Sequence, residues 1–162
     1  MQAINIAVVQ TLLHWEDVDA NLQHFESKIE GIKECDLIVL PEMFSTGFSM
    51  KPELLAKESR EKSIAWLLRM SAKLNSAIMG SFMHYDQGKY YNALAFVNPE
   101  QEIQWYYKRH LFSPGDESKH YSAGKDRLVI DYKGWRICPF ICYDLRFPVF
   151  SRNNCGIDLM VY

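Results

Sequence analysis

The stretch Leu-Ile-Val-Leu-Pro-Glu at positions 37–42 joins a short, wholly apolar run to a proline and then to a carboxylate. Consecutive apolar residues without polar alternation are typical of a strand that is buried on both faces of a sheet. Proline ends such a strand, so Glu42 follows the carboxyl end, where open α/β sheets bind ligands. A lone glutamate after a strand more often faces water. The stretch therefore predicts a covered sheet with a candidate site at its edge.

Helical patterns flank this stretch on both sides. Asp17 is a suitable N-cap, and the residues after it carry apolar side chains at helical spacings of three and four: Leu22, Phe25, Ile29 and Ile32. A second helix is predicted over residues 60–74, where its apolar face covers the sheet.

Short apolar runs elsewhere predict the remaining strands. Turn-forming residues separate most of these runs, as expected for hairpins and a β-meander. The predicted strands are residues 4–9, 77–84, 90–97, 103–107, 128–132, 136–142 and 158–162, with a short helix over 147–152. The polar stretch 108–125 is long enough to be a functional loop.

Composition limits the classes of function. The 162 residues include 18 Lys or Arg and 20 Asp or Glu, for a net charge of −2, with 48% hydrophobic residues. This indicates a single globular domain over residues 1–162, and it argues against nucleic acid or anionic lipid as partners. No apolar run approaches the roughly 20 residues that span a bilayer. Four cysteines without an export signal predict reduced thiols in the cytoplasm rather than disulfides.

The chain ends within the apolar run 159–162, which reads as a central strand with nothing after it to cover its face. Natural domains rarely end at such a strand. We therefore expect this chain to be the N-terminal portion of a longer protein.

Two further strand ends carry reactive side chains. Lys108 ends the strand 103–107, and Cys142 ends the run 136–141 just before a helix, near backbone N–H groups that favour a thiolate. Each alone has an ordinary explanation, a solvated lysine and a packed cysteine. Together with Glu42 they supply a cation, a nucleophile and a base, the three roles that acyl transfer needs.

Three blocks around these residues resemble a known family. They are Leu-Pro-Glu-Met-Phe at 40–44, Tyr-Lys-Arg-His-Leu-Phe at 107–112 and Cys-Tyr-Asp-Leu-Arg-Phe-Pro at 142–148. In this order they resemble the signature blocks of the nitrilase (carbon-nitrogen hydrolase) superfamily, over residues 4–162. The sequences of these blocks are most similar to those of bacterial omega-amidases (2-oxoglutaramate amidases).

The resemblance implies an α-β-β-α sandwich that assembles in pairs, and a hydrolase that cleaves a small amide to an acid and ammonia through a cysteine thioester. Glu42 matches the general base, Lys108 the cationic stabiliser and Cys142 the nucleophile. Glu117 matches a second glutamate that orients Lys108 or helps to position the substrate. The Tyr143 N–H joins Lys108 in stabilising the oxyanion. No metal or organic cofactor is expected.

Substrate recognition is assigned to residues near these blocks. Arg146 is a candidate for binding a substrate carboxylate, as an omega-amidase requires, although pairing with Asp144 is an equally good interpretation. Phe44 and Phe48, with Tyr143 and Phe147, are candidates for lining the pocket, although aromatic residues beside motifs are more often core. Deaminated glutathione and N-carbamoyl compounds remain alternative substrates.

Three other interpretations compete. A thiol hydrolase would pair Cys142 with His110 or His120, but it leaves the Glu42 block unexplained. Zinc binding lacks paired ligands at suitable spacing. The strongest alternative is a non-catalytic fragment or dimerisation piece of such an enzyme, because of the abrupt C-terminus.

Overall fold

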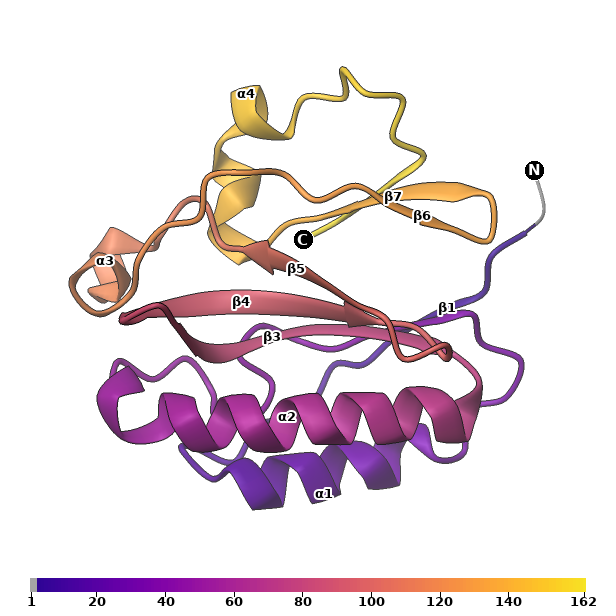
Figure 1. Ribbon diagram of the computed structural model, residues 1–162, viewed down its shortest axis with the longest axis horizontal. Helices are drawn as coiled ribbons and strands as arrows, with labels where there is room; N and C mark the ends of the chain where they lie inside the picture. Colours follow the sequence, from indigo (N-terminus) through magenta and orange to yellow (C-terminus); the bar gives the residue numbers. More distant parts are fainter. Residues whose placement is uncertain (1–2) are drawn as a thin grey trace.

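The computed structural model describes residues 3–162, so positions 1 and 2 of the predicted domain lie outside it. The chain forms two β-sheets (Figure 1). The first sheet consists, in spatial order, of β1 (Ile6–Val8), β2 (Leu37–Val39), β3 (Ala77–Asp86), β4 (Lys89–Val97) and β5 (Ile103–Tyr107). The second consists of β6 (Ile130–Tyr132), β7 (Trp135–Pro139) and β8 (Leu159–Val161). Each of these strands was predicted, with small shifts at the ends.

Pairing in the first sheet changes direction halfway across. β1, β2 and β3 are parallel, whereas β3, β4 and β5 form the predicted antiparallel meander. The β3–β4 turn places Gln87 and Gly88 at φ values of 46° and 79°. Two consecutive positive φ values match the right-handed twist of a tight hairpin, which explains the glycine at the second position.

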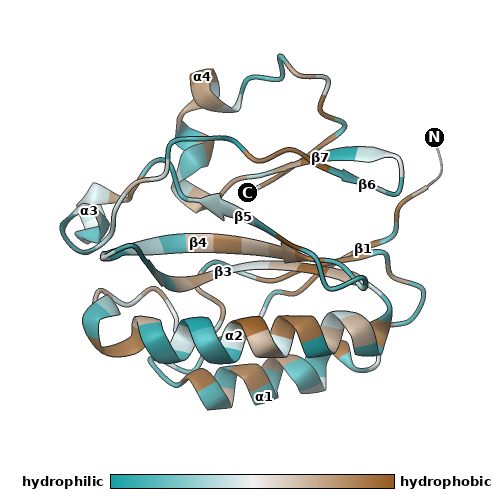
Figure 2. Cartoon of the chain, in the orientation of Figure 1, coloured by the Kyte–Doolittle hydropathy of each residue, from teal (hydrophilic) through white to brown (hydrophobic). Residues whose placement is uncertain are grey.

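Two helices cover one face of the first sheet (Figure 1). Helix α1 (Val18–Ile29) begins at the predicted N-cap, where the Asp17 side chain accepts a hydrogen bond from the Ala20 N–H. Helix α2 (Pro52–Leu74) lies beside it, and the apolar side chains that the two helices share with the sheet include Phe25, Ile29 and Leu67. Figure 2 shows brown, apolar residues on both helices, interspersed with hydrophilic ones.

Helix α2 begins eight residues before the predicted start at position 60. Its first turns bury Ala56, Ser59 and Ser63 instead of large apolar residues. The Ser59 hydroxyl hydrogen-bonds that of Ser45 at 3.0 Å, so this part of the buried face is polar. A periodicity of large apolar residues is therefore absent there, while Pro52 at the first helical position marks the true start.

The second sheet covers the other face of the first. Leu37, Met79 and Phe96 from the first sheet pack in one cluster with Ile137 and other residues of the second. The short helix α4 (Pro148–Ser151) lies beyond the second sheet, onto which its Phe150 packs. The described residues thus form three layers of the predicted α-β-β-α sandwich: the helical layer of α1 and α2, the first sheet and the second sheet. Helix α4 lies at the position of the second helical layer.

Strand β8 was predicted to be a central strand, but in the structure it is an edge strand. It pairs with β7 alone among the described strands, at the edge of the second sheet, and its three residues are half-buried. Across residues 3–162, no helix combines the length and the apolar character needed to cross a bilayer.

Candidate functional site

The three predicted strand ends meet at one place. Glu42 follows β2, Lys108 follows β5 and Cys142 follows β7, so both sheets contribute. A cavity of about 410 Å³ opens between the sheets, lined by Glu42, Ser81 and Cys142 together with apolar side chains such as Leu94 and Ile141. The side chain of Lys108 is only 1% exposed and contacts Glu42, which lines this cavity.

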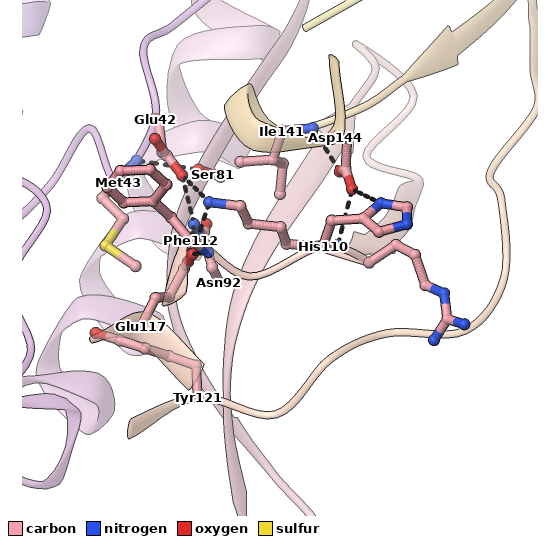
Figure 3. A network of polar contacts seen from close by, with 12 residues as sticks. Glu42, Met43, Ser81, Asn92, His110, Phe112, Glu117, Tyr121, Ile141 and Asp144 are labelled. Carbon is pink, nitrogen blue, oxygen red and sulfur yellow. Dashed lines mark hydrogen bonds and ion pairs between the residues drawn. The ribbon is translucent and has the colours of Figure 1, made fainter. Parts of the chain in front are cut away.

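Lys108 is held between two carboxylates, Glu42 and Glu117, which are labelled in Figure 3. Its Nζ atom lies 2.7 Å from Oε1 of Glu42 and 2.8 Å from Oε2 of Glu117. Burial alone would lower the pKa of Lys108, but the charges of Glu42 and Glu117 outweigh it and raise the pKa above its ordinary value. The ammonium therefore stays charged, and it has one N–H left for a further partner.

The two carboxylates differ in how many donors they receive. Glu117 is completely buried and accepts from Lys108, from the Phe112 N–H at 2.6 Å and from Asn92 at 3.0 Å. Glu42 is 21% exposed at its side chain, and its Oε1 atom accepts from Lys108 and from Asn92 at 2.8 Å. Both of these donors lie on Oε1, so neither occupies the second oxygen, Oε2.

A tight turn presents Glu42 at the cavity. Met43 adopts a positive φ of 47°, and its N–H donates to the Ser81 hydroxyl at 3.0 Å. The Phe44 N–H donates to the Ser81 carbonyl, also at 3.0 Å. The turn after β2 is thereby fixed to β3, which explains why a polar serine is retained in this buried strand.

The loop after β5 folds back to hold Lys108. Its 3-10 helix η1 (Ser113–Gly115) and the single turn α3 (Glu117–His120) bring Glu117 under the lysine. The Gly124 N–H donates to the Lys108 carbonyl at 2.8 Å. A Cβ atom on Gly124 would lie 2.1 Å from the Tyr107 carbonyl oxygen, so only glycine permits this close approach.

Cys142 begins the 3-10 helix η2 (Cys142–Arg146) and has a positive φ of 41°. The completely buried Asp144 holds this turn. Its carboxylate accepts from the Tyr106 hydroxyl at 2.6 Å and from the Ile141 N–H at 3.1 Å, and it lies 2.8 Å from Nδ1 and 2.9 Å from the backbone N of His110. The turn that begins at Cys142 is thus fixed to β5 and to the loop that follows it. Figure 3 shows the contacts of Asp144 with Ile141 and His110.

The thiol of Cys142 is protonated at neutral pH. Burial, followed by the charge of Glu42 and a hydrogen bond to it, raises the pKa of Cys142 to about 11, although Lys108 acts in the opposite direction. The expectation that backbone N–H groups favour a thiolate here is therefore wrong. Nucleophilic attack by this cysteine requires a base, and Glu42 is the carboxylate that contacts it.

Two predicted substrate-binding residues lie away from the cavity. Phe44 is completely buried in the core beneath α1 and α2, against Phe25, because its position in the turn directs it inward. Arg146 lies on an outer surface hollow with Arg109 and Phe147. It makes no ion pair with Asp144, whose oxygens are already occupied by donors of the described chain.

The other supporting residues do lie beside the site. Phe48 is half-buried, and its ring centroid is 5.3 Å from Nζ of Lys108. Tyr143 follows Cys142 in the first turn of η2, and its ring contacts those of Phe112 and Phe147.

Neither histidine of the competing thiol-hydrolase interpretation reaches Cys142. His110 pairs with Asp144 and stacks on Phe147 at 3.8 Å, whereas His120 is exposed on α3. Within the described range 3–162, no group of three or more His, Cys, Asp or Glu side chains is arranged to hold a metal ion.

Two residues of this site were not identified from the sequence as part of it. Asn92 lies within a predicted strand and Asp144 within the cysteine block, where it was considered only as a partner of Arg146. Both are buried polar residues whose partners lie 25 to 50 positions away in the chain. The one available signal was a polar residue inside an otherwise apolar strand, Asn92 between Tyr91 and Ala93.

Comparison with known proteins places the chain in the carbon-nitrogen hydrolase family. The sequence profile of the carbon-nitrogen hydrolase family matches residues 5–162. The chain is 40% identical over 162 residues to the omega-amidase YafV of Escherichia coli K12, covering all of this chain and 63% of that protein. It is 33% identical over 153 residues to the 2-oxoglutaramate amidase of Bacillus subtilis, covering 92% and 59% of the two chains. The chain thus spans about three fifths of the length of these relatives.

The fold has a similar counterpart among solved structures. XC1258 from Xanthomonas campestris, described as a CN-hydrolase superfamily protein with an arsenic adduct in the active site, superimposes with a TM-score of 0.88 at 38% identity. The match covers 94% of this chain and 58% of that one. The predicted resemblance, fold class and similarity to omega-amidases are confirmed by these comparisons.

Proposed function

Because this chain belongs to the carbon-nitrogen hydrolase family, we propose that the protein hydrolyses the amide bond of a small omega-amide carboxylate, such as 2-oxoglutaramate, to an acid and ammonia. The observation that carries this proposal is the shared site of Glu42, Lys108 and Cys142, in which one carboxylate contacts both the ammonium and the thiol. The similarity to proteins named omega-amidase and 2-oxoglutaramate amidase supports the substrate class.

Glu42 is the general base in this proposal. Its Oε2 atom remains available, whereas Glu117 receives three donors and is completely buried. A carboxylate that is saturated with donors is a poor proton acceptor, so Glu117 orients Lys108 instead. The proton that leaves the Cys142 thiol passes to Glu42.

The thiolate of Cys142 then attacks the amide carbonyl carbon, and negative charge develops on the carbonyl oxygen. The third N–H of Lys108, which neither carboxylate occupies, donates to this oxygen together with the Tyr143 backbone N–H. Donors that are fixed in place before the reaction need no rearrangement, and one such donor contributes about 3 kcal/mol.

Collapse of this intermediate breaks the C–N bond. Glu42 returns its proton to the departing nitrogen, ammonia leaves, and the acyl group remains on Cys142 as a thioester. Glu42 next accepts a proton from water, whose oxygen attacks the thioester carbonyl. The acid is released, and the proton returns to the sulfur.

We also propose that the protein acts as a homodimer or a higher homo-oligomer in the cytoplasm. Exposed apolar side chains on η2 and α4, Leu145 and Val149, support a contact with a second copy. The four free cysteines support a reducing compartment. Light scattering of the purified protein tests the assembly, and a monomeric mass contradicts it.

Ammonia release from 2-oxoglutaramate by the whole protein tests the proposed reaction. We expect release by the wild type, none by Cys142→Ala, and an added acyl mass on the Cys142 peptide after rapid acid quenching. A folded wild-type protein that releases no ammonia from 2-oxoglutaramate, deaminated glutathione or N-carbamoyl substrates contradicts the proposal.

A further inference from the structure

Asn92 lies in strand β4, and its side chain is completely buried between the two carboxylates of the site. Its Nδ2 atom donates to Oε1 of Glu42 at 2.8 Å and to Oε1 of Glu117 at 3.0 Å (Figure 3). Ionised carboxylates only accept hydrogen bonds, so the amide nitrogen must face them. Asn92 is therefore the one described side chain besides Lys108 that bridges both glutamates.

The charges of the site explain why such a bridge is needed. Two carboxylates share a single ammonium, which leaves one negative charge uncompensated. Carboxylates in that situation tend to share a proton, and a protonated Glu42 cannot accept one from Cys142. An amide that donates to both carboxylates stabilises their ionised forms without adding a charge.

The other polar atom of Asn92 supports the same conclusion. Its Oδ1 atom is buried and accepts no hydrogen bond from the described chain. A buried acceptor without a partner destabilises a fold, and an apolar residue of similar size would avoid that cost. The two donated hydrogen bonds are thus what the asparagine contributes at this position.

We propose that Asn92 is a positioning residue: it keeps Glu42 ionised and, by holding Oε1, leaves Oε2 directed at Cys142. The inference rests on the amidase function proposed above. Asn92 also fixes the cation, because its backbone carbonyl accepts from the Lys108 N–H at 3.0 Å. A single residue of β4 thus holds the base, the cation and the second carboxylate in one arrangement.

Asn92→Leu and Asn92→Asp in the whole protein test this role. Both remove the donors, but only aspartate adds a charge, so an effect that the two variants share reports the lost donors. We expect kcat/KM at pH 7 to fall about 100-fold in both, mainly in kcat. We also expect the acidic limb of the pH–rate profile to move up by about one pH unit, because a carboxylate without its donor holds a proton more tightly.

Asn98→Asp is the matched control. Asn98 also donates from Nδ2 to a glutamate, Glu102, at 2.8 Å, but it lies at the other end of β4, in the turn to β5. We expect kcat/KM and the acidic limb of the pH–rate profile of Asn98→Asp to match those of the wild type. A fall in rate without movement of the acidic limb in both folded Asn92 variants, or no fall at all, overturns the proposal.

Alkylation of Cys142 by iodoacetamide separates this inference from the proposed reaction, because it needs no amide substrate. The rate at Cys142 is followed against pH by peptide mass spectrometry, with the exposed Cys155 as an internal reference. We expect the acidic limb of Cys142 alkylation to move up in both Asn92 variants while the Cys155 profile is unchanged. Unmoved Cys142 profiles refute the role of Asn92 even if the amidase activity is confirmed. Moved profiles without ammonia release from any amide support the positioning role and refute the amidase.

Discussion

The end of β5 and the loop after it contribute residues to two polar networks, which differ in how their carboxylates are occupied. Tyr106 and His110 point to Asp144, whereas Lys108, which lies between them in the chain, points to Glu42 and Glu117. Asp144 is completely buried, with donors at both oxygens. Glu42 is partly exposed, and its donors Lys108 and Asn92 both lie on Oε1.

This difference separates a carboxylate that holds structure from the one that we propose as the base. A buried carboxylate with a full set of donors is stabilised as an anion and has no remaining site for a proton. Burial and the contact with Asp144 also raise the pKa of Tyr106, so its hydroxyl remains a donor. Counting donors in the folded protein thus distinguishes Asp144 from Glu42.

Cys142→Ala is expected to have the largest effect on activity. Loss of the nucleophile removes the covalent route, so we expect a fall in kcat of about 10⁶-fold, to the background rate. The free energy of unfolding is expected to change little, because Cys142 is exposed. Ammonia release and urea unfolding measure the two effects, with Cys155→Ala as the control. Retained turnover in Cys142→Ala would show that Cys142 is not the nucleophile.

Glu42→Gln sharpens the comparison by removing the base without removing the side chain. We expect kcat to fall about 10³-fold, because no other carboxylate of the described site offers a free oxygen to the thiol. Stability is expected to change by about 1 kcal/mol, since Lys108 keeps Glu117 as a partner. Steady-state kinetics and thermal unfolding check this. A loss of stability without a loss of turnover would show that Glu42 has a structural role, like Asp144, and is not the base.

Lys108→Met is expected to lower both turnover and stability. We expect kcat to fall about 10² to 10³-fold with little change in KM, because the cation acts on the transition state. The completely buried Glu117 also loses its counter-ion, so we expect a loss of about 3 to 5 kcal/mol in stability. Kinetics and urea unfolding measure both effects. An effect confined to KM contradicts the proposed role.

Asp144→Asn tests the structural network. The new NH₂ group would face donors, the Tyr106 hydroxyl or the Ile141 N–H. We expect a loss of about 2 to 3 kcal/mol in stability and a fall of about tenfold in kcat as the Cys142 turn loosens. Tyr106→Phe, which removes one donor, is expected to cost about 1 kcal/mol. An Asp144→Asn protein as stable as the wild type would refute the anchoring role.

The ion pair between α1 and α2 is expected to have the smallest effect. A hydrogen bond from Arg69, with its charge, lowers the pKa of Glu26 to about 2. A lowered pKa in the folded state stabilises the fold above the unfolded value of 4.5, and this contribution is lost as the pH falls toward 2. Because Arg69 is half-exposed, we expect Glu26→Gln to cost less than about 1 kcal/mol at pH 7, with no change in turnover. Urea unfolding of the wild type and Glu26→Gln checks this: equal free energies of unfolding at pH 2 and a difference at pH 7 confirm the contribution of the ion pair.

Much of this arrangement follows from local sequence patterns. The strand ends at Glu42, Lys108 and Cys142 are local features, because each reactive residue directly follows an apolar run. The first turns of α2 were missed, since serines line their buried face. The direction of a side chain after a turn is not local either, which is why Phe44 and Arg146 were misplaced.

The contacts of Asn92 and Asp144 were beyond local patterns for a different reason. Asn92 meets Glu42 only because β3 and β4 pair in one register, and Asp144 meets Tyr106 only because the two sheets stack. The same stacking partly desolvates the Cys142 thiol beside Glu42, so the pKa of the thiol is raised rather than lowered. Such contacts depend on tertiary structure rather than on spacing.

Glu42, with its Oε2 atom free of Lys108 and Asn92, is proposed to take the proton of Cys142. Alkylation of Cys142 measured against pH in the wild type and in Glu42→Gln tests it most directly. In the wild type we expect a thiol pKa of about 11 and an additional acidic limb in the alkylation profile that depends on Glu42. In Glu42→Gln we expect this limb to disappear and the thiol pKa to fall, because the neighbouring negative charge is lost. Identical profiles in the two proteins would contradict the account.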